Sequence, residues 1–504
     1  MKHKQVEQQN FGTVTELLRQ SCLNREDQLL FIEKRKDGHR ITNRRWEQEL
    51  LETVGKVRNL EAQHIGVICD LTYQCILCLY AVMVAGKVVV PLEADLTADS
   101  LDKYIHKADI ELLLYNEDRI DGTVSRCETL TIPEFLARPG KALSQWPTWE
   151  EGRNACIFFT SGTEGEPNGV LLTQKNMAFV TTYGAERPLN RNARALLFLP
   201  FHHVFSFLTL TACISDGCEI YLSGSIKYVS RELSEVKPDV LVTVPMFNEL
   251  IRSRISKGIH NSGKAGQIAG LIKLSNALRR LGLDLRTPLF RKLRESLGGI
   301  PQLLITGGSA VSVESIRFFD DIGIIVLQAY GMTETSCSIS TNSLKKNRHG
   351  SVGHPRPYNQ VRIKDSEIQV RGENVMKGYY KDPQATQRAF DGDWFRTGDL
   401  GYFDRDGYLF ITGRKKNLII LSNGENVSPE ELETQLLQCD AIEEVVVMER
   451  QGHIHAEIFP KGEEAVIRHA IDSLNHRNPV YKRIVSWELR DTPFDKTSSL
   501  KIRR

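Results

Sequence analysis

Short apolar runs alternate with longer helical stretches along the first half of the chain. Strand-like runs occupy residues 64–70, 87–93 and 110–116, and a helical apolar stretch at 75–86 lies between the first two. Three further apolar runs end in turn residues, at 194–201, 218–224 and 239–245. Apolar strands separated by helical segments are typical of parallel or mixed sheets that helices cover on both faces. The pattern predicts an α/β fold.

The longest apolar stretch, residues 75–90, is interrupted by Gly86 and Lys87. A membrane-spanning helix needs about 20 consecutive apolar residues, so we expect a buried helix followed by a strand and no transmembrane segment. Cys75 and Cys78 form a C-x-x-C pair in this stretch. We favour small hydrophobic side chains on a buried helix face, and a redox or metal pair is the alternative.

The region from 252 to 294 is rich in lysine and arginine. Apolar residues recur in it at helical spacing, namely Ile268, Leu271, Ile272, Leu278 and Leu281. We expect an exposed helical excursion. A solvated helical face is the favoured interpretation, and a patch that contacts a carrier protein or a membrane surface is the alternative.

The pattern changes again near Arg414, where short Gly-rich strands give way to a clear helix start. Ser428 is a natural N-cap, Pro429 suits the first helical position, and Glu431 would complete a capping box. Two strand-like runs and a second helix follow. About ninety residues with this pattern can form a small independent α/β domain.

The length of 504 residues is too great for one compact core. We therefore expect a large domain of helix-covered parallel or mixed sheets at 1–413 and a small, mobile α/β domain at 414–504. The net charge of +2 gives no footprint for nucleic acid or an anionic membrane. The polar start of the chain and ten scattered cysteines predict a reduced, cytoplasmic protein without a signal peptide, although a peripheral membrane contact stays open.

The strongest local motif follows an apolar run at 155–159. It reads Thr160, Ser161, Gly162, Thr163, Glu164, Gly165. Glycines let backbone N–H groups approach phosphate oxygens, and hydroxyls add donors or reach a metal ion. The loop lacks the G-K-[ST] of a Walker A motif and runs into another strand. A Ser/Gly-rich hairpin turn is the alternative interpretation.

This string resembles the phosphate loop of the adenylate-forming superfamily, which includes acyl-CoA synthetases, peptide-synthetase adenylation domains and luciferases. Seven further segments resemble the superfamily's motifs in their order: 199–204, 306–312, 328–335, 371–380, 394–401, 413–433 and 496–504. The resemblance runs from about residue 10 to the end and looks closest to bacterial long-chain fatty acyl-CoA synthetases.

The resemblance implies an acid–thiol ligase. A carboxylate would attack the α-phosphate of ATP to give an acyl-adenylate and pyrophosphate, and the acyl group would then pass to coenzyme A. Two anions must meet, so the site must supply positive charge and fixed dipoles. Glu334 would bind Mg²⁺, with help from the Thr160 hydroxyl, and Thr333 would contact the α-phosphate.

Further nucleotide contacts are implied by the matched motifs. Gly308, Ser309 and Ala310 would lie against the adenine, Tyr330 would stack near it with Gly331 beside it, Asp399 would accept hydrogen bonds from the ribose hydroxyls, and Arg414 would contact the ribose or the phosphates.

The small domain would act twice, rotating between the two half-reactions about a hinge at Lys416. Lys501 would bridge the carboxylate and the α-phosphate in the first step, as a mobile point charge can. A frayed basic tail is the alternative for Lys501, and Lys496 is the competing lysine. Gly424 would reach the thiol tunnel in the rotated state.

Some positions depart from the superfamily's pattern. Asn168 and Glu166 stand where basic residues are common, Leu500 replaces a glycine before the lysine, and Asn423 replaces a glycine beside the tunnel. The first two changes suggest a catalytically weakened nucleotide-binding relative as a hypothesis of another class. Glu334 and Lys501 argue against it.

The acid is indicated by the residues after Phe201. Amino-acid adenylation domains usually carry an Asp there, whereas this chain has His202 and His203. We expect His203 to lie beside the carboxylate, and histidines that merely cap a strand end are the alternative. The stretch 224–251 resembles that of fatty acyl-CoA synthetases, which favours a medium- or long-chain fatty acid. An aryl acid, or an acyl carrier protein as the thiol acceptor, remains an alternative.

Overall fold

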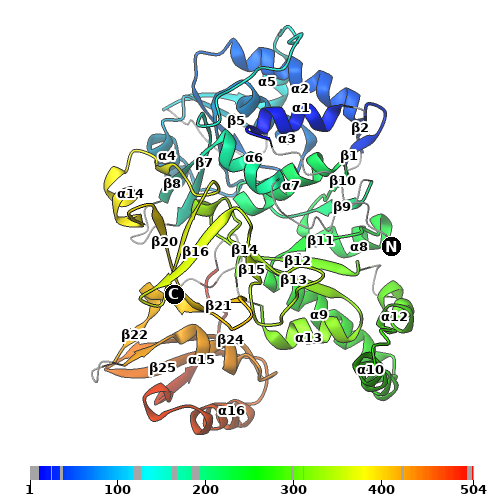
Figure 1. Ribbon diagram of the computed structural model, residues 1–504, viewed down its shortest axis with the longest axis vertical. Coiled ribbons are helices and arrows are strands. Elements are labelled where there is room, and N and C mark those ends of the chain that lie inside the picture. The colour runs from blue at the N-terminus through cyan, green and yellow to red at the C-terminus, as the bar shows by residue number, and fades with distance from the viewer. Residues whose placement is uncertain are drawn as a thin grey trace.

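The computed structural model describes residues 11–23, 25–33, 38–116, 126–161, 167–182, 192–296, 300–309, 311–421, 425–496 and 502. These residues form six β-sheets with helices packed on their faces (Figure 1). The α/β fold predicted from the apolar pattern is confirmed. No helix within these ranges combines the length and apolar character that crossing a membrane requires.

A seven-stranded sheet carries the phosphate-loop motif. Its order is β18-β8-β7-β4-β3-β5-β6, and the strands from β7 to β6 are parallel. The bounds are β3 (His64–Ile68), β4 (Val88–Leu92), β5 (Leu112–Tyr115), β6 (Glu128–Thr131), β7 (Asn154–Ser161), β8 (Pro167–Thr173) and β18 (Gly378–Tyr379). The apolar stretch predicted as helix then strand forms α3 (Tyr73–Val84) and β4. Cys75 and Cys78 are fully buried in α3, as small hydrophobic side chains.

Two further sheets complete the apolar framework, and most of their strands are parallel. The four-stranded sheet has the order β2 (Arg40–Thr42), β1 (Leu29–Glu33), β10 (Glu219–Leu222), β9 (Arg194–Leu197). The five-stranded sheet has the order β11 (Leu241–Thr243), β12 (Leu303–Thr306), β13 (Ile325–Tyr330), β14 (Ser340–Thr341), β15 (His354–Pro355). The carboxyl ends of β12 and β13 lead directly into two of the predicted nucleotide motifs.

Helices cover these sheets, and their apolar faces form the largest core clusters. Their bounds are α1 (Val14–Cys22), α2 (Asn43–Arg58), α4 (Ala98–Ala108), α5 (Ile132–Ala137), α6 (Gln174–Thr182), α7 (Val204–Asp216), α8 (Val229–Val236), α9 (Pro245–Asn261), α10 (Ala265–Arg280), α11 (Arg286–Leu289), α12 (Arg291–Ser296) and α13 (Val313–Asp321). The helical excursion expected between 252 and 294 is confirmed as α9 to α12.

An antiparallel sheet leads to the last part of the chain. It contains β16 (Asn359–Lys364), β17 (Glu367–Gly372), β19 (Phe390–Asp391), β20 (Trp394–Phe403) and β21 (Leu409–Arg414), with α14 (Pro383–Ala389) nearby. The remaining elements are β22 (Ile419–Ile420), β23 (Asn426–Val427), α15 (Pro429–Leu436), β24 (Ile442–Arg450), β25 (His453–Pro460), α16 (Glu464–Arg477) and β26 (Ser486–Leu489). These last elements, orange and red in Figure 1, share an apolar core. Its buried members among the described residues lie between Ile419 and Ile484, and Trp487 packs against them.

The start of α15 corrects one prediction. The helix begins at Pro429, as expected, but the capping box with Glu431 is wrong. The Ser428 hydroxyl lies 2.8 Å from the carbonyl oxygen of Thr412 and 2.9 Å from a carboxylate oxygen of Glu430, so it does not cap the helix. Glu431 instead forms an ion pair with Lys482 at 2.7 Å. Ser428 therefore ties the start of α15 to β21.

Candidate functional site

The phosphate-loop motif connects two paired antiparallel strands. Thr160 at the end of β7 lies opposite Asn168 in β8, and Ser161 lies opposite Pro167. Gly162, Thr163, Glu164 and Gly165 lie outside the described residues. The other edge of β8 pairs with β18, so that Tyr379 lies opposite Val170. In the sheet, β8 thus lies between β7 and the edge strand β18, which carries Tyr379.

Glu334 lies buried beside this edge, in the short 3₁₀ turn Thr333–Thr335, with Thr333 half-buried. The Tyr379 hydroxyl donates a hydrogen bond of 2.9 Å to its Oε1 atom. Burial raises the pKa of Glu334 above its usual value, while its backbone N–H and the Tyr379 hydroxyl oppose that rise. Buried carboxylates are normally paired or bound to metal ions. The oxygen donors of Glu334 and Thr160 are the type that Mg²⁺ prefers, so these residues fit the implied metal ion.

The turn that carries Glu334 is fixed by a buried amide. Nδ2 of Asn374 donates to the carbonyl oxygens of Thr335 (3.0 Å) and Ser338 (2.7 Å), and the Ser336 hydroxyl donates to the Asn374 carbonyl (2.9 Å). A Cβ atom on Gly331 would lie 2.2 Å from the backbone of Cys337, so the turn requires glycine there.

Asn374 and Tyr379 are not among the site residues predicted from the sequence. Both lie in the segment 371–380, which resembles a structural motif of the superfamily and predicts no site residue. No local signal marks an asparagine or a tyrosine as the partner of a turn that is forty residues earlier in the chain. The pairing of β18 with β8 brings Tyr379 there, and the side-chain amide of Asn374 reaches the turn through its own hydrogen bonds.

A second buried carboxylate, Asp399, joins three strands. The Tyr330 hydroxyl at the end of β13 donates to its Oδ2 atom at 2.7 Å. Nε of Arg414, its cross-strand neighbour on β21, lies 2.9 Å from Oδ1. The Asp399 side chain is only 5% exposed, whereas that of Arg414 is 43% exposed. Burial and the Asp399 charge raise the pKa of Tyr330, so its hydroxyl stays a donor at neutral pH.

The residue after Arg414 is anchored in the same way. Lys415 forms an ion pair of 3.0 Å with Glu367, and the other oxygen of Glu367 accepts from the backbone N–H of Gly398. Lys416, the predicted hinge, is exposed in the short 3₁₀ turn Lys415–Asn417. Two buried carboxylates therefore hold the two residues that precede Lys416.

The predicted adenine segment follows β12. Gly308 has a φ of 90°, and no atom lies within 4 Å of a Cβ placed on it. Gly308 and Ser309 are exposed, so their backbone is accessible. Ala310, Gly424 and Lys501 lie outside the described residues, and their assigned roles stay predictions.

The two histidines lie at the start of α7. Their ring centroids are 4.1 Å apart, and His203 occupies the N-cap position without a side-chain cap bond. Burial, reinforced by the neighbouring His203, lowers the pKa of His202 to about 3, so its imidazole is neutral. Neither ring nitrogen of His202 has a hydrogen-bond partner among the described residues. A neutral imidazole whose buried ring nitrogens lack hydrogen-bond partners can bind a polar group of a substrate.

Comparison with known proteins identifies the family. The model for AMP-binding enzymes matches residues 58–380, which contain the phosphate loop, the buried Glu334 and Tyr379. This chain belongs to the AMP-binding enzyme family. The resemblance drawn from the motifs is thereby confirmed.

Two curated relatives are named long-chain-fatty-acid–CoA ligase FadD15. The one from Mycobacterium bovis is 31% identical over 73% of this chain and 68% of its own length. The one from Mycobacterium tuberculosis is 35% identical over 58% of this chain and 52% of its own length. The solved structure of o-succinylbenzoate CoA synthetase from Bacillus subtilis, with its acyl-adenylate intermediate, covers 96% of each chain at a TM-score of 0.76 and 21% identity. That likeness shows the shared fold.

We expect Tyr379→Phe to lower the free energy of unfolding by about 1–3 kcal/mol, because a buried carboxylate would lose its side-chain donor. Denaturant unfolding of the whole chain measures the loss. The matched control is Tyr380→Phe, whose hydroxyl bonds to the partly exposed Asp109. That variant should lose less than about 1 kcal/mol. Equal losses in the two variants would show that the contact with Glu334 is not special.

Proposed function

We propose that this family member is an ATP-dependent fatty acid–CoA ligase. The observation that carries the proposal is that the candidate site contains two buried carboxylates, each held by its own hydrogen-bond or ion-pair partners. Asp399 is held by Tyr330 and Arg414, and Glu334 is held by Tyr379 beside the phosphate-loop hairpin. One carboxylate suits ribose hydroxyls, and the other suits a cation that accompanies phosphates.

The first half-reaction joins the acid to AMP. A carboxylate oxygen attacks the α-phosphorus of ATP, and the bond to the bridging oxygen breaks, so that pyrophosphate leaves. Thr333 precedes Glu334 in the turn and would contact the α-phosphate. When bound, Mg²⁺ neutralises charge on the phosphate oxygens. Lys501 would bring a further positive charge to the carboxylate and the α-phosphate.

The second half-reaction passes the acyl group to a thiol. The sulfur of coenzyme A attacks the acyl carbon, the bond to the AMP oxygen breaks, and AMP leaves. Residues 1–413 would hold the nucleotide, and residues 414–504 would rotate about Lys416 to bring Gly424 towards the thiol. The separate apolar core after Ile419 supports this division. Polar contacts at the junction also support it, because such contacts can exchange with water during a rotation.

A fatty acid is the proposed substrate class. The curated relatives are named for long-chain fatty acids. A small, mainly apolar cavity is lined by Leu197, Phe198, Leu199, Phe201, Ser206, Thr209 and Val242, most of which flank the histidines in the sequence. Its volume of about 10 Å³ is room for a single water molecule. An acyl chain would therefore need these side chains to move.

Release of pyrophosphate from ATP and Mg²⁺ tests the proposal, with a panel of fatty and aryl acids and with or without coenzyme A. We expect sustained turnover only when coenzyme A is present, with a medium- or long-chain fatty acid as the best substrate. Preference for an aryl acid would contradict the substrate class. A single burst that an acyl carrier protein, but not coenzyme A, converts into turnover would contradict the acceptor. No release with any acid would favour a weakened relative, with Glu166 and Asn168 as the first residues to exchange for lysine.

Lys501→Ala should lower the rate of acyl-adenylate formation by at least about a hundredfold, because a charge positioned on the reacting groups is lost. The same variant should convert supplied acyl-AMP and coenzyme A to thioester at the wild-type rate. Lys496→Ala is the control, since Lys496 forms an ion pair with Glu444 in the structure. If Lys501→Ala forms acyl-adenylate at the wild-type rate, or if only Lys496→Ala loses this rate, the catalytic lysine is Lys496 and not Lys501.

A further inference from the structure

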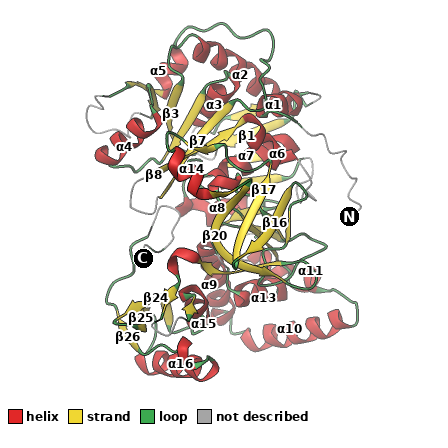
Figure 2. Cartoon of the chain, turned by 60° about the vertical axis from the view of Figure 1, so that its left-hand side comes forward, coloured by secondary structure: helices red, strands yellow, loops and turns green. Residues whose placement is uncertain are grey.

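Leucine side chains are exposed along α10 and the segment after it. Leu281 is 78% exposed, Leu283 55% and Leu274 54%. Leu271, Leu285 and Leu289 are also exposed, each by more than a third. We call these six leucines the α10 surface. Figure 2 shows α10 at the edge of the molecule.

Contacts with the rest of the protein use a different face of α10. Ile268 and Ile272 pack against the apolar cluster beneath the helix. Asn276 donates to Asp321 at 2.7 Å, and Arg279 pairs with Asp320 at 2.6 Å, both on α13. Leu271 and Leu274 are offset from these residues around the helix. The leucines are therefore not used to pack α10 against the rest of the protein.

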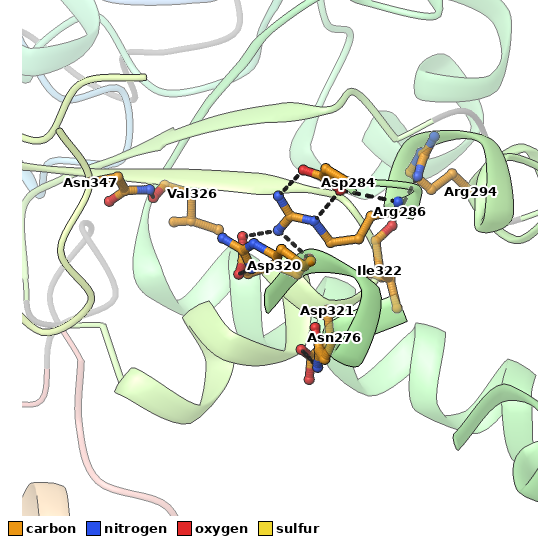
Figure 3. A network of polar contacts seen from close by, with 10 residues as sticks. Asn276, Asp284, Arg286, Arg294, Asp320, Asp321, Ile322, Val326 and Asn347 are labelled. Atoms are coloured by element: carbon orange, nitrogen blue, oxygen red, sulfur yellow. Dashed lines mark hydrogen bonds and ion pairs between the residues drawn. The ribbon is translucent and has the colours of Figure 1, made fainter. Parts of the chain in front are cut away.

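Buried arginines fix the segment between α10 and α12 (Figure 3). Arg286 pairs with Asp284 and with Asp320 and also donates to the carbonyl oxygen of Asp320 at 3.0 Å. Arg294 donates to the carbonyl oxygens of Ile322 (2.9 Å) and Thr287 (2.8 Å). This network holds the segment in a defined shape. Leu281, Leu283 and Leu285 consequently stay outside the core.

The charge along α10 and the second half of α9 is one-sided, and the next carboxylate along the chain, Asp284, is paired with Arg286. Residues 250–283 contain seven lysines and arginines and not one Asp or Glu, in a chain whose net charge is only +2. Four of these cations are exposed and have no acidic partner in the part of the chain that the structure describes: Lys257, Lys264, Lys273 and Arg280. A surface with exposed leucines and unpaired cations is complementary to a partner that is both anionic and apolar.

A second copy of the chain does not meet that requirement. A two-fold symmetric contact would place the same cationic surface against itself, so like charges would oppose each other. An anionic bilayer supplies phosphate groups for the lysines and arginines and an acyl-chain boundary for the leucines. Helices with exposed leucines and flanking cations lie in that boundary without spanning it.

We propose that the α10 surface binds the headgroup layer of an anionic membrane. The leucines enter the acyl-chain boundary, and Lys273 and Arg280 contact lipid phosphates with their stems along the apolar surface. The contact is peripheral and weakens as salt screens the charges. The exposed leucines and the unpaired cations would bind such a membrane whether or not the protein has the proposed ligase activity.

Vesicle co-sedimentation of the full chain tests the proposal without any catalytic readout. We expect binding to vesicles of three parts phosphatidylcholine to one part phosphatidylglycerol, and little binding to phosphatidylcholine alone. Lys273→Gln with Arg280→Gln should lower the partition coefficient about fivefold for each charge removed. Leu274→Ser with Leu281→Ser and Leu283→Ser should lower it by more than about tenfold.

Matched controls change exposed residues that lie outside the α10 surface. Leu437→Ser with Val480→Ser and Val485→Ser, and Arg405→Gln with Lys461→Gln, should bind like the wild type. Wild-type chain that fails to sediment with the anionic vesicles overturns the proposal, as do losses that are equal in the control variants. The proposal would also be overturned if the chain bound an acidic carrier protein but not vesicles, and if the leucine variant lost that binding. A wild-type chain that is dimeric in solution, and a leucine variant that is monomeric, would also overturn the proposal.

Discussion

Asp399 lies buried between the hydroxyl of Tyr330 and the guanidinium of Arg414, and the candidate site depends on this arrangement. The three residues come from β13, β20 and β21, so the carboxylate joins the end of a parallel sheet to the strand that leads into the last domain. A buried charge is costly unless it is paired and hydrogen-bonded. That cost fixes the orientation of Arg414, whose exposed side remains available to a nucleotide. Lys415 and Glu367 repeat the arrangement one residue later.

The parts of the fold that the sequence predicts are those with a strong apolar period. The strands at 64–70, 87–93 and 110–116 and the buried helix between them match β3, β4, β5 and α3. Burial on both faces leaves such runs almost continuously apolar, so the pattern is visible without any tertiary information. The start of α15 at Pro429 was equally clear, but its capping box was wrong. Ser428 has a tertiary partner in Thr412, which no local rule contains.

The candidate site was predicted where one segment carries several of its residues. The turn with Glu334 and the strand with Asp399 each belong to a contiguous motif. Tyr379 and Asn374 were missed as site residues because their role arises only when β18 pairs with β8 and the amide meets the turn. The α10 surface shows the opposite case, since the sequence predicts an exposed basic helix but does not show which of its leucines the core leaves outside.

Transfer of oxygen from the acid to AMP tests the central claim most directly. The protein is supplied with ATP, Mg²⁺, coenzyme A and a fatty acid in which both carboxylate oxygens are a heavy isotope. The masses of the products are then measured by mass spectrometry. Attack of the carboxylate on the α-phosphate predicts one heavy oxygen in AMP and the other in the acyl-CoA carbonyl. Heavy oxygen in inorganic phosphate, accompanied by ADP, would mean attack on the terminal phosphate and would contradict an acyl-adenylate.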